Sequence, residues 1–199
     1  MKSLFYISFL IFLLAPAVKA QQSPLFTQYM FNDFVLNPAV AGTKDFYQIR
    51  SNHRFQWVGI TDPPLTNTLS IYGPHSTLPM GFGGYFYNDV TGPTSRTGLT
   101  GSYAYHITVQ EGMYLSGGIS FGLLQYKFDG TQVNIKDKTD AAIQPLVNSA
   151  YMPDAGVGFY LYTKQYYAGL SASQLLNNKL SVFEVKSGLN RLKSHLYLT

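Results

Sequence analysis

The stretch MYLSGGISFGLLQYKF, from Met113 to Phe128, decides the fold. Apolar side chains occupy alternate positions along it and small or polar residues lie between them: Met113, Leu115, Ile119, Phe121 and Leu123 on one face, Ser116, Gly118, Ser120 and Gly122 on the other. A period of two over this length predicts a β-strand with one apolar and one polar surface. In a membrane barrel the apolar surface faces lipid and the polar surface faces the lumen.

The same alternation recurs along most of the chain. We expect about eight strands: Phe46 to Val58, Thr66 to Tyr72, Met80 to Tyr87, Arg96 to Ile107, Met113 to Phe128, Ala155 to Tyr162, Gln165 to Ala172, and Arg191 to Thr199. The predicted fold class is all-β, an antiparallel outer-membrane β-barrel over residues 46–199, in preference to a soluble β-sandwich. Because the last strand stops in mid-pattern, we expect an N-terminal portion of a larger barrel whose C-terminal strands are missing.

The links between these strands support the barrel. Outer-membrane barrels alternate short periplasmic turns with longer external loops. Short links are expected at Pro74 to Pro79, Thr108 to Gly112 and Thr163 to Gln165, and longer ones at Gly59 to Leu65, Asn88 to Ser95, Asp129 to Met152 and Gln174 to Asn190. Aromatic residues are expected at the membrane interfaces: Tyr103, Tyr105, Tyr114, Tyr160, Tyr162, Tyr166 and Tyr167 on the periplasmic side, Tyr126 and Phe128 on the outer side.

Residues 1–20 are typical of a secretory signal peptide. Lys2 supplies a positive charge, Leu4 to Leu14 an apolar core, and Val18-Lys19-Ala20 a small-residue cleavage site. The apolar run is too short for a spanning helix. Cleavage between Ala20 and Gln21 would make Gln21 the first residue of an exported protein.

The composition favours a membrane location and excludes several kinds of site. Charged residues make up 12% of the chain and aromatic residues 16%, which is unlike both a soluble domain and a disordered one. No cysteine is present, which excludes disulfides, thiolate zinc sites, cysteine nucleophiles and a lipidated cysteine. The formal net charge is +4, or about +2 without Lys2 and Lys19, so no nucleic-acid partner is expected.

We expect no catalytic residues, no metal and no cofactor, and therefore no enzyme. All ten acidic residues lie outside the inferred strand centres, so no paired carboxylates are expected on the barrel scaffold. The histidines lack metal-ligand spacing: His53, His75, His106 and His195. Gly81-Phe82-Gly83-Gly84 and Gly117-Gly118 lack the other residues of a phosphate loop, and we expect these glycines to relieve crowding on strands.

Basic residues are expected on the lumen face, at Arg50, Arg54, Arg96 and Lys193. Two interpretations stay open: an anion-preferring pore, or basic residues paired with acidic residues of a loop, a plug or the missing strands. We favour pairing.

The segment from Gln21 to Asp45 is unusually apolar for a chain exposed to the periplasm. It contains Phe26, Tyr29, Met30, Phe31, Phe34, Val35 and Leu36. Apolar patches of this kind are contact surfaces. We expect this segment to pack under the barrel mouth, to enter the lumen as a plug, or to dock on a partner.

Motifs from the expected mature N-terminus to the last residue resemble the PorP/SprF family of type IX secretion system membrane proteins. They are QYMFNDFVLNPAVAG (Gln28 to Gly42), HRFQW (His53 to Trp57), PPLTNTLSIYGP (Pro63 to Pro74), YAYHI (Tyr103 to Ile107), YYAGLSASQLLN (Tyr166 to Asn177) and the closing KSHLYLT. The opening motif is the most specific. In the family, further strands follow the final motif, which implies that part of the barrel is absent here.

The resemblance implies an outer-membrane barrel of the type IX secretion and gliding motility machinery, without catalytic residues. Its implied partners are the translocon, periplasmic ring components, a cargo protein with a C-terminal sorting domain, and outer-membrane lipid. The family signature matches Gln28, Tyr29, Asn37, Pro38, Ala39 and Gly42, and its Arg-x-Gln-Trp element matches Arg54, Gln56 and Trp57. These residues are expected to be structural, with partner docking open for the first group. The alternative function is a diffusion channel for anions or hydrophobic solutes.

Overall fold

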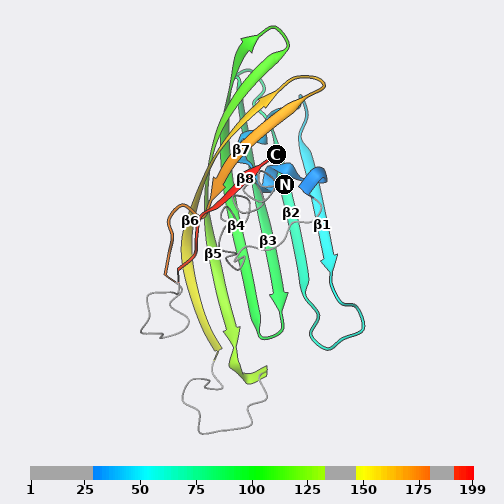
Figure 1. Cartoon of the computed structure of the whole chain (residues 1–199), viewed down its shortest axis with the longest axis vertical. Helices are drawn as coiled ribbons and strands as arrows, with labels where there is room; N and C mark the ends of the chain where they lie inside the picture. The colour runs from blue at the N-terminus through cyan, green and yellow to red at the C-terminus, as the bar shows by residue number, and fades with distance from the viewer. Residues whose placement is uncertain (1–28, 133–146, 180–190) are drawn as a thin grey trace, which may run out of the picture.

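Eight β-strands form one antiparallel sheet in the computed structural model, which describes residues 29–132, 147–179 and 191–199. The bounds are β1 Gln48–Phe55, β2 Leu65–Pro74, β3 Met80–Thr91, β4 Thr94–Gln110, β5 Met113–Asp129, β6 Val147–Tyr162, β7 Tyr167–Ser173 and β8 His195–Leu198. Each strand pairs with its neighbours in sequence. Figure 1 shows the strands running side by side in a sheet that curls into an open half-barrel. The prediction of an all-β, antiparallel partial barrel is confirmed.

The sheet has a turn end and a loop end. At the turn end, residues 75–79, 111–112 and 163–166 connect the strands by short turns. At the loop end, the links over residues 56–64, 130–146 and 174–194 are longer, as expected. No helix among the described ranges has the length and apolarity needed to cross a membrane.

The expected long link from Asn88 to Ser95 is wrong. β3 continues to Thr91 and β4 begins at Thr94, and these two threonines pair across the hairpin. Only Gly92 and Pro93 form the turn, and Gly92 adopts a left-handed conformation with φ of 53°, which glycine tolerates because it has no Cβ. Turn-favouring residues in this stretch suggested a loop, but cross-strand pairing extends both strands through them.

Some strands also differ from the prediction in length. β4 and β5 each contain 17 residues, and β6 begins at Val147 instead of Ala155. Asp154 therefore lies within β6, which corrects the expectation that all acidic residues lie outside the strand centres. Pairing with β5 extends β6 through Pro153, opposite Leu123. At the end of the described chain, β8 is shorter than expected, with 4 residues.

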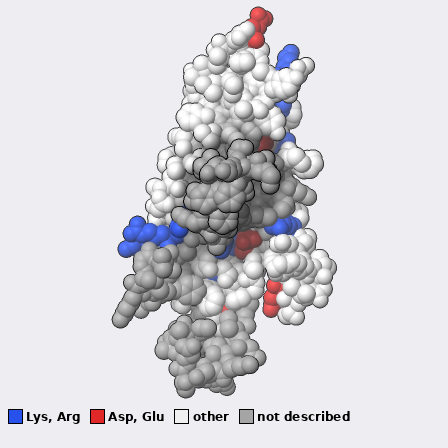
Figure 2. Space-filling view, in the orientation of Figure 1, with Lys and Arg blue, Asp and Glu red and all other residues white. Residues whose placement is uncertain are grey.

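The two faces of the sheet differ as the alternation predicts. On the outward face of β5, Phe121 is 66% exposed and Leu123 is 51% exposed. On the concave face of the same strand, Ser116 is fully buried. Charged side chains are sparse on the face of the molecule that Figure 2 shows, in keeping with their small share of the composition.

Part of the expected interfacial aromatic belt instead lies inside the half-barrel. Tyr162 stacks on Tyr114 with ring centroids 5.4 Å apart and lies 5.9 Å from the ring of Tyr160, which is buried. Tyr126 also faces inward, where the Arg96 guanidinium lies 5.6 Å from its ring centroid. The clustering of tyrosines in the sequence predicts that these rings lie near one end of a strand. Only the register of strand pairing shows whether each side chain faces inward or outward.

Candidate functional site: a segment docked on the concave face

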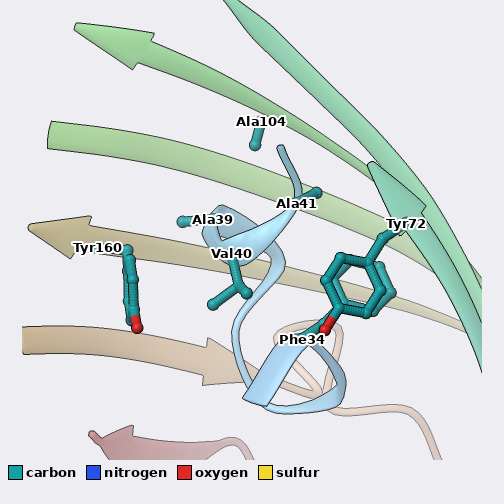
Figure 3. Close-up of a cluster of buried hydrophobic side chains, with 7 residues drawn as sticks. All are labelled: Phe34, Ala39, Val40, Ala41, Tyr72, Ala104 and Tyr160. Carbon is teal, nitrogen blue, oxygen red and sulfur yellow. The ribbon is translucent and has the colours of Figure 1, made fainter. Parts of the chain in front are cut away.

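A segment of short helical turns covers the middle of the concave face. It contains the 3₁₀ turns η1 Tyr29–Phe31, η2 Asp33–Val35 and η3 Pro38–Val40, and residues 29–43 are called the docked segment below. The local sequence favours the third turn, because Pro38 presets its own φ and the Asn37 side chain accepts a 3.0 Å hydrogen bond from the Ala39 backbone N–H. Figure 3 shows this segment lying against the strands, with its apolar side chains directed at them.

Apolar contacts anchor the docked segment to the sheet. The buried cluster consists of Phe34, Ala39, Val40 and Ala41 from the segment with Tyr72, Ala104 and Tyr160 from the strands. The Phe34 ring stacks on Tyr72 with centroids 4.4 Å apart and meets Tyr85 edge-on at 6.1 Å. Full burial of one such side chain stabilises by about 1.5–3 kcal/mol. The sheet thus covers Phe34 and the apolar residues 39–41, whereas Met30 and Phe31 of the same segment are 72% and 62% exposed.

Strand side chains satisfy the polar backbone of the docked segment. The hydroxyl of Ser116 donates to the carbonyl oxygen of Ala39 at 2.7 Å. The hydroxyl of Ser171 donates to the carbonyl oxygen of Leu36, also at 2.7 Å. Short 3₁₀ turns leave most of their carbonyl groups without an internal partner, and a buried carbonyl without one is costly. These hydrogen bonds therefore allow irregular backbone to be buried inside the half-barrel.

His106 makes a third such contact, at the edge of the segment nearest the turn end. Its Nε2 donates to the carbonyl oxygen of Ala41 at 2.9 Å. Since Nε2 then carries the proton, Nδ1 is free to accept the 3.2 Å hydrogen bond from the Tyr162 hydroxyl. The chain of Ala41, His106 and Tyr162 fixes both the tautomer and the ring orientation of the histidine.

Small residues on the strands create the space that the segment occupies. One inward-facing row, in register from β3 to β7, consists of Gly81, Ala104, Gly118, Gly158 and Ser171. A Cβ atom at Gly118 would overlap the backbone of Ala39. A Cβ atom at Gly158 would overlap the side-chain oxygen of Asn37. These glycines do relieve crowding, and the group that approaches them is the docked segment.

Asp33 brings a carboxyl group into the interior of the half-barrel, where the side chain of Arg50 also lies. Burial raises the pKa of Asp33, while the positive charge of Arg50 and hydrogen bonds, including one from Tyr160, lower it by less. The Tyr160 hydroxyl lies 3.5 Å from the carboxylate. Arg50 also donates a 2.6 Å hydrogen bond to the side-chain oxygen of Gln48. Asp33 and Arg50 thus interact electrostatically across the boundary between segment and sheet.

The structure brings several of the sequence-derived signature residues together. Asn37, Pro38 and Ala39 are buried in the docked segment, and Gly42 follows them with φ of 81° against Gly81. Tyr29 belongs to η1. The signal peptide, its cleavage positions Ala20 and Gln21, and Gln28 lie outside the described residues.

The remaining candidate residues are dispersed. Arg50, Arg54 and Arg96 lie on the concave face of β1 and β4, whereas Lys193 is exposed in the link before β8. Gln56 and Trp57 follow β1 at the loop end. Trp57 is 65% exposed and adopts a left-handed backbone conformation with φ of 54°.

Sequence reasoning missed the residues that receive the segment, namely Ser116, Ser171 and His106. The signal was present, because small residues occupy alternate positions on several predicted strands. Only the register shows that they form one continuous row. Of the residues that the structure describes, no group of three or more His, Asp, Glu or Cys could hold a metal ion.

One hollow lies at the loop end of the sheet, and another lies at the turn end beside Gly42 and Thr43 of the docked segment. The loop-end hollow has a volume of about 450 Å³ and is lined by Phe55, Pro63, Pro64, Leu65 and Val90 among others. The turn-end hollow has a volume of about 460 Å³ and is lined by Lys44, Asp45, His75 and Lys164 among others. The first is mainly apolar and the second mainly polar.

Comparison with known proteins identifies one family. The model of the family described as type IX secretion system membrane protein PorP/SprF matches residues 18–199. No curated protein and no solved structure matches the chain.

Proposed function

The chain belongs to the PorP/SprF family of type IX secretion system membrane proteins, and on that premise we propose that it holds partners at an outer-membrane barrel with a closed lumen. In this proposal the protein reaches the outer membrane through its N-terminal signal peptide. It catalyses no reaction and serves secretion or gliding motility by binding.

The docked segment carries the proposal. A channel for solutes needs an open, wetted interior, as in the larger barrels. Here Phe34, Ala39 and Val40 fill the middle of the concave face. The carbonyl groups of Leu36, Ala39 and Ala41 accept hydrogen bonds from three strands. A segment with this many satisfied backbone groups is part of the fold, which favours a plug over a mobile gate.

Conductance of the full-length protein in planar bilayers tests the closed lumen. We expect no steady conductance from the intact protein and a measurable one after deletion of residues 29–43. Heat-modifiable migration on gels checks that the deletion variant still forms a barrel. A steady open conductance of the intact protein would contradict the proposal and favour the alternative, a diffusion channel for anions drawn by Arg50 and Arg54.

The loop end is the proposed contact surface for a secreted or surface cargo. Trp57, Val58 and Ile60 are 65%, 85% and 54% exposed in the link between β1 and β2, next to the apolar hollow there. Large exposed apolar groups of this kind mark interaction sites. A triple change of these residues to serine should abolish cargo capture by the full-length protein, with Lys164→Ser at the turn end as the matched control. Equal capture by both variants would remove this surface from the proposal.

The turn end is the proposed contact surface for periplasmic components of the machinery. Its hollow combines Lys44, Lys164 and His75 with Asp45, a polar surface suited to reversible contacts between soluble domains. Charge reversal at Lys44 and Lys164 should weaken copurification of ring components and leave cargo capture intact. Loss of cargo capture with unchanged copurification of ring components would instead assign the turn end to the cargo and the loop end to the periplasmic components.

A further inference from the structure

One row of the outward face is polar from β1 to β6. Direct cross-strand partners connect His53, Asn67, Asn88, Thr97, Gln125 and Tyr151, and these residues are called the polar row below. All of them belong to the outward set of positions, whose alternate neighbours face the lumen. A continuous polar row is unexpected on a face that is otherwise largely apolar.

Hydrogen bonds join the polar row in pairs. His53 Nδ1 donates to Asn67 Oδ1 at 2.7 Å. The Asn88 amide donates to the Thr97 hydroxyl at 2.9 Å. The Gln125 amide donates to the Tyr151 hydroxyl at 3.0 Å. Each pair satisfies some polar atoms and leaves others for an outside partner, because amides and hydroxyls have several donor and acceptor sites.

On β4 to β6 the polar row separates two different environments along the strands. The next outward row toward the turn end contains Leu69, Phe86, Leu99 and Leu123 from β2 to β5. The next row toward the loop end contains Phe55, Leu65 and Val90 on β1 to β3, where they line the loop-end hollow, and Ser95, Lys127 and Ser149 on β4 to β6. Charge on the outward face of β5 therefore begins only beyond the polar row.

The apolar part of β5 matches the thickness of a membrane. Outward positions from Leu123 to Met113 are apolar residues or glycine. At about 3.3 Å per residue they cover about 33 Å along the strand, or roughly 25 Å along the membrane normal at a tilt near 40°, which is the height of the apolar band of a membrane barrel. The polar row lies immediately above this band.

We propose that the polar row is the outer-leaflet boundary of the protein and hydrogen bonds to the polar headgroups of the lipid there. This inference rests on the proposed outer-membrane location with the loop end outside. Amide and hydroxyl groups suit this position, because they carry no charge and can exchange water for headgroup oxygens without desolvating a full charge. Tyr151, an amphipathic ring that is 64% exposed, is the residue type that membrane interfaces favour.

Single-cysteine scanning of the full-length protein tests the boundary, and residues 1–199 contribute no competing thiol. The positions are Lys127, Gln125, Leu123 and Phe121 along β5, with Ser149 and Leu99 as repeats on neighbouring strands. Each variant is treated with a membrane-impermeant maleimide in intact cells, in permeabilised cells, and after purification into phosphatidylethanolamine and phosphatidylglycerol vesicles. Denaturation in SDS gives the total labelling.

Lys127→Cys and Ser149→Cys should label in intact cells, Gln125→Cys at least several-fold less, and Leu123→Cys, Phe121→Cys and Leu99→Cys only after denaturation. Labelling of the leucine positions equal to that of Lys127→Cys overturns the boundary. Protection of Gln125→Cys in cells but not in vesicles also overturns it, since a protein would then cover the row. If the same order of labelling is seen in permeabilised cells but not in intact cells, the boundary is supported and the loop end faces the periplasm. Failure of the boundary and failure of the proposed orientation therefore give different labelling patterns.

Discussion

The side-chain amide of Asn37 donates a 3.0 Å hydrogen bond to the backbone carbonyl of Phe159, 122 residues later in the chain. Its oxygen meanwhile accepts the Ala39 N–H, so one buried side chain both shapes the docked segment and fastens it to β6. Asn37→Ala leaves both partners unsatisfied and should lower the free energy of unfolding by about 2–6 kcal/mol, at about 1–3 kcal/mol for each of the two groups. Urea unfolding of the full-length protein in detergent measures this.

The control for that prediction is Asn148→Ala, at the exposed start of β6. An asparagine on the surface should contribute within about 0.5 kcal/mol. Equal urea midpoints for the two variants and the unmodified protein would contradict the prediction. They would show that the docked segment does not contribute to the cooperative unfolding of the protein.

Two adjacent glycines of β5 should respond oppositely to the same change. Gly118 faces the docked segment, and a Cβ there would overlap Ala39; Gly117 faces outward, and the nearest atom to a Cβ there is 3.8 Å away in Phe159. Gly118→Ala should therefore destabilise by about 1–3 kcal/mol through overpacking. Gly117→Ala should be neutral or slightly stabilising, because alanine loses less backbone entropy than glycine. Equal loss in both variants would indicate a general intolerance of β5, and not a docking groove.

Much of the fold could be predicted because alternation at period two is a local property. Met113 to Leu123 shows it on both faces of the strand, with Gly117 among the apolar positions, and β5 covers the whole stretch to Phe128. The approach fails where local and cross-strand preferences disagree. Asn88, Gly92 and Pro93 favour a loop locally, yet β3 and β4 pair as far as Thr91 and Thr94, because a hairpin needs only two turn residues.

The candidate site was less predictable, because it depends on register between distant strands. The sequence shows that residues 21–45 are too apolar to stay exposed, and it offers a plug as one of three outcomes. It does not show that Gly118, Gly158 and Ser171 fall in one row, since a shift by one residue would place any of them on the other face. The same argument explains the inward tyrosines, such as Tyr160, which clustering alone assigned to the membrane interface.

His106 and Tyr162 should show graded effects on the docked segment. His106→Ala removes the donor to Ala41 and should destabilise by about 1–3 kcal/mol, the cost of a buried carbonyl without a partner. Tyr162→Phe keeps the ring stacked near Tyr114 and removes only the hydroxyl that orients the histidine, so a smaller loss of about 0.5–1.5 kcal/mol is expected. Limited proteolysis within the docked segment, read together with urea unfolding, measures both. A larger effect of Tyr162→Phe than of His106→Ala would contradict this order.

Asp33 should make docking dependent on pH. Because burial raises its pKa above the ordinary value of 3.8, the folded state binds the proton more tightly than the unfolded state does. The contribution of Asp33 to stability is therefore fully present below the unfolded pKa and is lost as pH rises through the folded pKa. Asp33→Asn, which is neutral throughout, should be more stable than the unmodified protein at pH 7, and the difference should shrink on acidification toward pH 4. Arg50→Gln removes the positive charge that partly offsets the burial of Asp33. In that background the stability gained by Asp33→Asn at pH 7 should be larger.

Urea midpoints at several pH values between 4 and 8 test this prediction. Destabilisation by Asp33→Asn at pH 7 would mean that the attraction between Asp33 and Arg50 outweighs the cost of burying the carboxylate.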